Sequence, residues 1–202
     1  MKITRFVSFF IALAMIGMAV SCAGGVATAI PEGENNLSGS AVEILTLLVD
    51  DLRNDGVHMP LTFPASIITA DESQSIIGLS AENFDKYAVS ASDSLAAIST
   101  LAHQMIVIEA KDEDAAEQIK NLMTSDGGYD VHKWTYVWPQ RAAVVESGNY
   151  VMLVASYFDV VDAAIDCFEV AAGGEIGYVD VFFEATSEQI ELGLMQRNDK
   201  PL

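Results

Sequence analysis

The sequence predicts an α+β fold, in which an antiparallel sheet of about four strands carries helices packed mainly on one face. Two apolar, β-branched segments between residues 141 and 156 are separated by the turn-forming residues 147–149, which is the pattern of a β-hairpin. A second pair of strand-like segments lies between residues 88 and 110. A helix-like amphipathic segment separates the two pairs, and hairpins separated by a helix are typical of α+β rather than α/β proteins.

The first 21 residues have the character of a bacterial signal peptide. Lys2 and Arg5 form a short basic head, and the apolar run 6–20 is shorter than the roughly 20 residues of a membrane-spanning helix. Small residues surround Cys22 directly after this run, which resembles the lipobox of bacterial lipoproteins. The resemblance implies cleavage before Cys22 and a diacylglycerol on its thiol. Two alternatives are cleavage after Ala29, which ends an A-x-A site, and an uncleaved anchor helix.

The remainder of the chain divides into three parts. Residues 22–39 are rich in small and polar residues and predict a flexible tether. Residues 40–174 are expected to form a single α+β domain, because they are numerous enough to bury a core. Residues 175–202 form an ambiguous C-terminal extension. Within it, residues 178–182 alternate like an added strand, and residues 186–189 have the capping-box spacing of a short last helix.

Capping residues mark where four helices of the domain begin. They lie at Ser40, Thr69, Ser80 and Asp112. A fifth helix is expected from Asp159 to the glycine pair 173–174. Between the first two helices, Pro60 and Pro64 predict an extended connector.

Four strands are expected in the sheet. They are Ala88–Ile98, Gln104–Ala110, Arg141–Glu146 and Tyr150–Ser156. The second of them contains the continuous apolar run 105–108, which is typical of a strand that is covered on both faces.

The chain is strongly acidic, with 29 acidic and 10 basic residues and a formal net charge of −19. The signal peptide contains two of the basic residues and no acidic residue. Its removal therefore leaves 8 basic and 29 acidic residues, which give a charge of −21. Nucleic acid and anionic lipid head groups repel such a chain, and we therefore exclude DNA and RNA as partners. With Cys22 acylated, Cys167 is the remaining cysteine, and its place near the apolar face of a helix predicts a buried, inert thiol.

Residues that could carry chemistry are sparse. The sequence has no motif of a serine hydrolase, a nucleotide-binding loop, a redox dithiol or a zinc protease, so we expect no catalytic residue, cofactor or metal site. Trp134 and Trp138 lie four residues apart and would share one face of a helix. We expect these rings to pack in the core, and the alternative is an exposed platform on which a sugar or peptide stacks.

The order of these features and two particular segments carry a family resemblance. The segments are Met105–Lys111 (MIVIEAK) and Ala143–Ala155 (AVVESGNYVMLVA), and the second leads at once into a helix. Between residues 41 and 172 the chain resembles the bacterial lipoproteins that carry domain of unknown function 4358. The resemblance implies an α+β fold and an extracytoplasmic location, and it supplies no catalytic residue. Two features depart from the family: the glycine pair 127–128, which interrupts a helix that is usually continuous, and the C-terminal extension.

These observations lead us to expect an exported lipoprotein that is anchored to the outer face of the cytoplasmic membrane through Cys22. Its domain is expected to be a non-enzymatic binding or interaction domain for an envelope protein or a ligand. Two other functions stay open: a structural subunit of an envelope assembly, and a hydrolase that uses paired carboxylates. The abundant acids permit a hydrolase, but a sequence alone does not show which carboxylates pair in space.

Overall fold

The computed structural model describes residues 37–98, 100–134, 137–174 and 176–191. These residues form a six-stranded antiparallel sheet with the strand order β1-β2-β3-β5-β4-β6. The strands are β1 Ser66–Ile67, β2 Ala88–Leu95, β3 Gln104–Ala110, β4 Arg141–Ser147, β5 Tyr150–Ser156 and β6 Val179–Glu184. The helices are α1 Ala41–Asn54, α2 Ala70–Ile77, α3 Ala81–Tyr87, α4 Glu113–Thr124, α5 Phe158–Ala171 and α6 Ser187–Glu191.

The predicted α+β class is confirmed, while the number of strands is six rather than about four. The four expected strands are β2, β3, β4 and β5, with differences only at the ends of β2 and β4. The fifth and sixth strands lie at the two edges of the sheet. The short strand β1 belongs to the segment expected as an extended connector, and β6 belongs to the C-terminal extension, which also contains the short helix α6.

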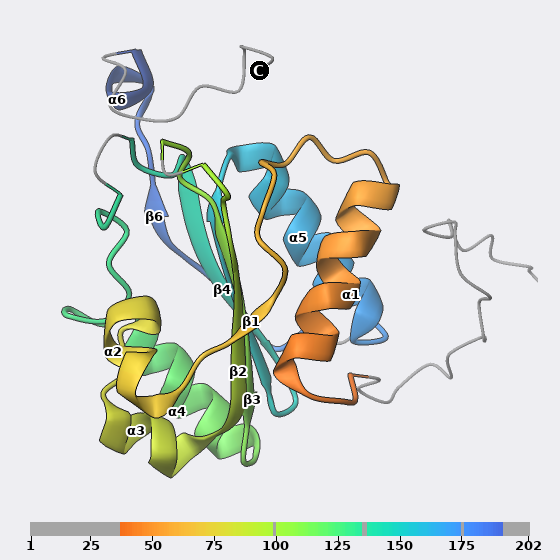
Figure 1. Cartoon of the computed structure of the whole chain (residues 1–202), viewed down its shortest axis with the longest axis vertical. Helices are drawn as coiled ribbons and strands as arrows, with labels where there is room; N and C mark the ends of the chain where they lie inside the picture. Colours follow the sequence, from red (N-terminus) through yellow and green to blue (C-terminus); the bar gives the residue numbers. More distant parts are fainter. Residues whose placement is uncertain (1–36, 99, 135–136, 175, 192–202) are drawn as a thin grey trace, which may run out of the picture.

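The helices cover both faces of the sheet, so the expectation that they pack mainly on one face is wrong. Helices α1 and α5 lie on one side, and α2, α3 and α4 lie on the other (Figure 1). Two apolar cores result, one on each side of the sheet. The physical reason lies in the central strands: all seven residues of β5 are buried, and so are six of the seven residues of β3. A strand with apolar side chains on both faces is stable in water only when both faces are covered.

The helix starts follow the expected capping chemistry. Ser40 and Thr69 each form a complete capping box with the glutamate three residues later. The Ser80 hydroxyl accepts from the backbone N–H of Asn83, and Asp112 accepts from that of Ala115. These bonds satisfy N–H groups that have no partner within the helix.

Close backbone contacts fix the segment that follows α4. Gly78 ends α2 with a left-handed φ of 78°, and a Cβ atom placed there would lie only 2.2 Å from the carbonyl carbon of Gly128. A Cβ atom on Gly128 would in turn lie 2.4 Å from the carbonyl oxygens of Leu122 and Met123. Helix α4 ends at Thr124, and the glycine pair 127–128 that follows lets the chain turn across the end of α2.

Candidate functional site

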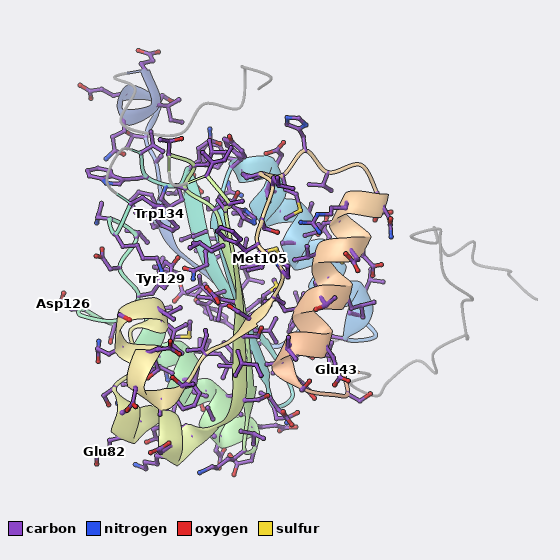
Figure 2. All side chains as sticks on the ribbon, viewed as in Figure 1. Glu43, Glu82, Met105, Asp126, Tyr129 and Trp134 are labelled. Carbon is purple, nitrogen blue, oxygen red and sulfur yellow. The ribbon has the colours of Figure 1, made fainter. Side chains whose placement is uncertain are left out.

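The structure places the two tryptophans singled out in the sequence in different surroundings. Within the described parts of residues 129–140 the backbone forms turns and extended chain without a helix, so the expectation of a shared helical face is wrong. Trp134 is buried, and its ring packs edge-on against Tyr129 with 6.5 Å between centroids (Figure 2). Trp138 is half-buried, with its ring edge-on to that of His132. The core-packing interpretation is confirmed for Trp134, and the pair does not form a joint stacking platform.

The structure describes one of the two cysteines. Cys22, the expected lipid-bearing residue, lies outside the described residues, as do the signal peptide and most of the tether. Cys167 is buried on α5, as the sequence predicted.

A network of polar side chains links β1, β2 and β3 to the loop after α4. Asp93 accepts hydrogen bonds from Ser66 Oγ at 2.8 Å and from Gln104 Nε2 at 2.9 Å. Oε1 of Gln104 accepts from the Tyr129 hydroxyl at 2.9 Å and from Lys133 Nζ at 2.5 Å. Asp93, Gln104 and Tyr129 are buried, and buried polar groups need such partners to offset the loss of water. The network therefore fastens the loop to the sheet.

Lys133 is the cation of this network. Its Nζ also donates to the carbonyl of Ile76 at 3.0 Å and lies 4.2 Å from the centre of the Tyr129 ring. Burial lowers the pKa of Lys133 to about 8, although the charges of Asp93 and Asp130 act in the opposite direction. These contacts hold the amine of Lys133 against the loop after α4 and against the end of α2.

His103 is a second buried titratable group. Its Nδ1 lies 2.8 Å from Ser156 Oγ, and its Nε2 has no hydrogen-bond partner in the part of the chain that the structure describes. Burial, and secondarily the charge of Arg53, lower the pKa of His103 to about 3. The imidazole is therefore neutral in the folded protein near neutral pH.

An acidic hollow of about 660 Å³ lies beside the first turn of α4 and the turn between β4 and β5. Its carboxylates are those of Glu113, Asp114, Glu117 and Glu146. Oε1 of Glu146 lies 2.7 Å from Nζ of Lys120, while Oε2 is buried and lacks a hydrogen-bond partner among the described residues. Across the described ranges, no three His, Cys, Asp or Glu side chains are placed to hold a metal ion. The hollow offers a negative surface that attracts cationic groups.

Large apolar side chains are exposed along the β1 edge of the sheet. Leu61, Phe63 and Ile67 are 69%, 56% and 69% exposed. They belong to the segment that leads from α1 to α2 and runs along this edge (Figure 1). Single exposed apolar residues are normal on a protein surface, but a group of them on one edge is typical of a contact site.

A groove of about 320 Å³ lies between α1 and this exposed segment. Its apolar lining residues are Val49, Leu61, Phe63, Pro64 and Ala65. Arg53 and Asp50 of α1 contribute the charged part of the lining. Nη2 of Arg53 donates to Thr62 Oγ1 at 2.7 Å, and Nη1 lies 3.8 Å from Oδ1 of Asp50. The guanidinium is thus bound into the wall of the groove.

The backbone of this edge is poorly suited to the addition of another strand. The inner side of the segment pairs with β2 through Ser66 and Ile67 and through an isolated bridge between Thr62 and Ala96. Pro64 lies between these contacts and has no N–H group to donate. Proline on an edge strand is a recognised protection against edge-to-edge pairing. The edge therefore offers side chains rather than a complete ladder of backbone groups.

The groove was not among the sites expected from the sequence. Two prolines dominate the segment and predicted only an extended connector. A signal was present in the spacing of Leu61 and Phe63, which flank the buried Thr62 in the alternating pattern of an edge strand. That alternation spans too few residues to distinguish a strand from a loop.

Comparisons with known proteins give no relative for this chain. No family model matches it, and neither the curated proteins nor the solved structures contain a significant match. The resemblance to lipoproteins with domain of unknown function 4358 stays a prediction. Over the described ranges, none of the helices has both the length and the apolar character needed to cross a membrane.

Proposed function

We propose that this chain is an exported, lipid-anchored interaction domain that contacts another polypeptide through the β1 edge of its sheet. The observation that carries the proposal is the exposure of Leu61, Phe63 and Ile67 together on that edge. Covering one such side chain contributes about 1.5–3 kcal/mol in transfer free energy. A partner that covers all three would gain enough to offset part of the entropic cost of association.

The anchoring part of the proposal rests on Cys22 and the apolar run before it. Two acyl chains hold a protein stably on a membrane, since each buried CH₂ contributes about 0.8 kcal/mol. The acidic domain adds no attraction to anionic lipid, so the lipid must supply the anchoring. Changing Cys22 to Ser should move the protein from the membrane fraction to the medium or leave it as unprocessed precursor. A wild-type protein in the aqueous phase with an unmodified terminus at Ile30 would contradict the proposal.

Site-specific photocrosslinking in the native cell tests the contact surface. A benzophenone amino acid at position 63 is compared with the same residue at position 170. Val170 is a matched control, because it is 58% exposed on α5, on a helix that takes no part in the groove. We expect a discrete protein adduct from position 63 and none from position 170. Equal adducts from both positions, or none from position 63, would overturn the proposed contact surface.

A carboxylate-dependent hydrolase is the second candidate, and the acidic hollow beside α4 supports it. Four carboxylates line that hollow, including Glu117 and Glu146. If it is catalytic, the purified chain should hydrolyse cell-wall glycan, and Glu146→Gln or Glu117→Gln should abolish the release of reducing ends. Glu82→Gln is the control, since Glu82 is exposed on α3 and does not line the hollow. Absence of turnover by the wild-type chain would remove this candidate.

A further inference from the structure

We infer that His103 is an acid-operated switch: when its ring takes up a proton, the end of α1 and the segment that follows it, residues 50–65, detach from the sheet, while the core on the opposite face stays closed. The basis is the place of the ring beneath α1, the hydrogen bonds of its two nitrogens and the charges around it. The switch goes beyond the proposed function and does not require that a partner binds the groove.

His103 lies on the face of the sheet that α1 and α5 cover. Its Nδ1 is 2.8 Å from Oγ of Ser156. Ser156 shares a face of β5 with Met152 and Val154, which belong to the core under these two helices. Both His103 and Ser156 are completely buried. Water therefore reaches the ring only when the segments that cover it move.

The closed structure has an acceptor for only one N–H group of the ring. A neutral imidazole donates from one nitrogen, whereas a protonated imidazole donates from both. Ser156 can accept from Nδ1, but Nε2 has no hydrogen-bond partner among the described residues. A protonated ring would thus bury a charged N–H group without an acceptor, which is costly. An open state in which water reaches the ring avoids this cost.

The surrounding charges also oppose protonation. Burial, and secondarily the charge of Arg53 on α1, lower the pKa of His103 to about 3. Residues 57–65 and 95–102 contain no carboxylate, and the one histidine among them, His58, is exposed. No carboxylate of the covering helices bonds to Nε2 in the described chain. These carboxylates, on the end of α1 and the start of α5, are Asp50, Asp51, Asp55, Asp159 and Asp162.

Backbone hydrogen bonds join the surroundings of the ring to the segment that would detach. The carbonyl of His103 accepts from the N–H of Ala96 at 3.0 Å, and the N–H of Ala97 donates to the carbonyl of Leu61 at 2.8 Å. The side-chain bond that closes the wall of the groove joins two residues within 50–65. Movement of this segment away from the ring would therefore also take the groove apart.

Residues 57–65 are held more weakly than the rest of the fold. Only Pro60 and Thr62 among them are buried. Segments with few buried side chains open at a lower free energy than the core does. Helix α4, by contrast, buries Ile119 and Met123 in the core on the other face of the sheet. A charge that forms on His103 should therefore open residues 50–65 before it unfolds the whole chain.

Hydrogen exchange of the whole chain, purified in detergent, tests the switch at pH 6 and at pH 4.5, after correction for the intrinsic exchange rate. The ring has its ordinary pKa of 6.5 in the open state and a lower one in the closed state, so closure loses stability as pH falls below 6.5. The opening equilibrium should then rise about tenfold per pH unit. Between the two pH values, protection of residues 50–65 should fall about twentyfold more in wild type than in His103→Gln. Protection of α4 should stay higher than that of residues 50–65 at both pH values.

His58→Gln is the matched control, because it makes the same substitution at an exposed histidine of the segment and should leave the wild-type response unchanged. His103→Asn, whose amide can take the place of Nδ1 beside Ser156, is the second variant if His103→Gln does not fold. Three results would overturn the inference. They are an equal fall in protection with and without the His103 ring, a response that His58→Gln abolishes, and an equal loss of protection in α4 and in residues 50–65, which would show that acid unfolds the whole chain at once.

Discussion

The hydroxyl of Tyr129 donates a hydrogen bond of 2.9 Å to Oε1 of Gln104, and both side chains are buried between the sheet and the loop after α4. The same oxygen accepts from Lys133, and the amide nitrogen of Gln104 donates to Asp93. One glutamine therefore satisfies three other polar groups. Such a network is stabilising when every member is bonded and costly when one is removed.

Removing Gln104 should destabilise the fold more than removing the Tyr129 hydroxyl. Gln104→Leu leaves the buried Asp93 and Tyr129 and the half-buried Lys133 without this partner, and we expect a loss of about 3 kcal/mol or more in the free energy of unfolding. Tyr129→Phe leaves Gln104 bonded to Lys133 and should cost about 1 kcal/mol. Urea denaturation of the two variants and of the double variant gives the comparison. Equal losses in both single variants would contradict the network.

The lowered pKa of Lys133 predicts a characteristic pH dependence. Its folded pKa of about 8 lies below the ordinary value of 10.5, so the unfolded chain binds more protons between these two values. The free energy of unfolding contributed by this group should therefore rise as pH increases from about 8 to 10.5, by about 3 kcal/mol in total.

The matched reference for this measurement is Lys133→Met, which keeps much of the side-chain volume but does not titrate. Both proteins carry Tyr129→Phe, because Lys133 lies 4.2 Å from the Tyr129 ring and its removal would change the titration of this tyrosine, whose pKa burial raises. The difference in unfolding free energy between Tyr129→Phe and the double variant with Lys133→Met is followed from pH 7 to pH 10.5. A constant difference would show that the amine is not desolvated.

Much of the fold could be predicted because it depends on local signals. The capping residues Ser40, Thr69, Ser80 and Asp112 act within one turn, and the hairpin at Gly148 is set by neighbouring residues. The continuous apolar run 105–108 also indicated that helices cover both faces of the sheet. A strand that is apolar on both faces requires two cores, and the expectation of helices mainly on one face did not take this requirement into account.

The candidate site was much less predictable, because it depends on contacts between distant segments. Arg53 and Thr62 come from different segments, and their hydrogen bond closes the wall of the groove only after α1 has packed on the sheet. Lys133 and Gln104 are 29 residues apart, and nothing in the sequence indicates that they meet. The same holds for Trp134, whose spacing from Trp138 predicted a helix that the described residues on either side of 135–136 do not form.

Gly78 should be far less tolerant of substitution than Gly56, although both have left-handed φ values, 78° and 74°. A Cβ atom at position 56 meets no atom within 4 Å, so Gly56→Ala should cost only the backbone strain of about 1–2 kcal/mol. At position 78 the Cβ atom would overlap the backbone of Gly128. Gly78→Ala should therefore cost at least about 3 kcal/mol, measured by urea denaturation. Similar losses for both variants would contradict the close approach of α2 and the glycine pair.

The protonation of His103 should weaken the fold at acid pH. Its folded pKa of about 3 lies below the ordinary value of 6.5, because a charged ring would be buried and near Arg53. The unfolded chain therefore binds more protons between these values, and the stability contributed by the neutral ring is lost as pH falls through that window. We expect a loss of up to about 1.4 kcal/mol per pH unit below 6.5.

The comparison with His103→Gln isolates this effect, since glutamine keeps a polar side chain that can face Ser156 and does not titrate. The capping carboxylates Glu43 and Glu72, whose pKa values are lowered by hydrogen bonds to Ser40 and Thr69, also lose charge in acid but are common to both proteins. The difference in unfolding free energy should be constant above pH 6.5 and should move steadily in favour of His103→Gln below it. A difference that stays constant down to pH 4 would mean that the pKa of His103 is the same in the folded and the unfolded chain. It would contradict the description of His103 as a buried ring with only one nitrogen hydrogen-bonded among the described residues.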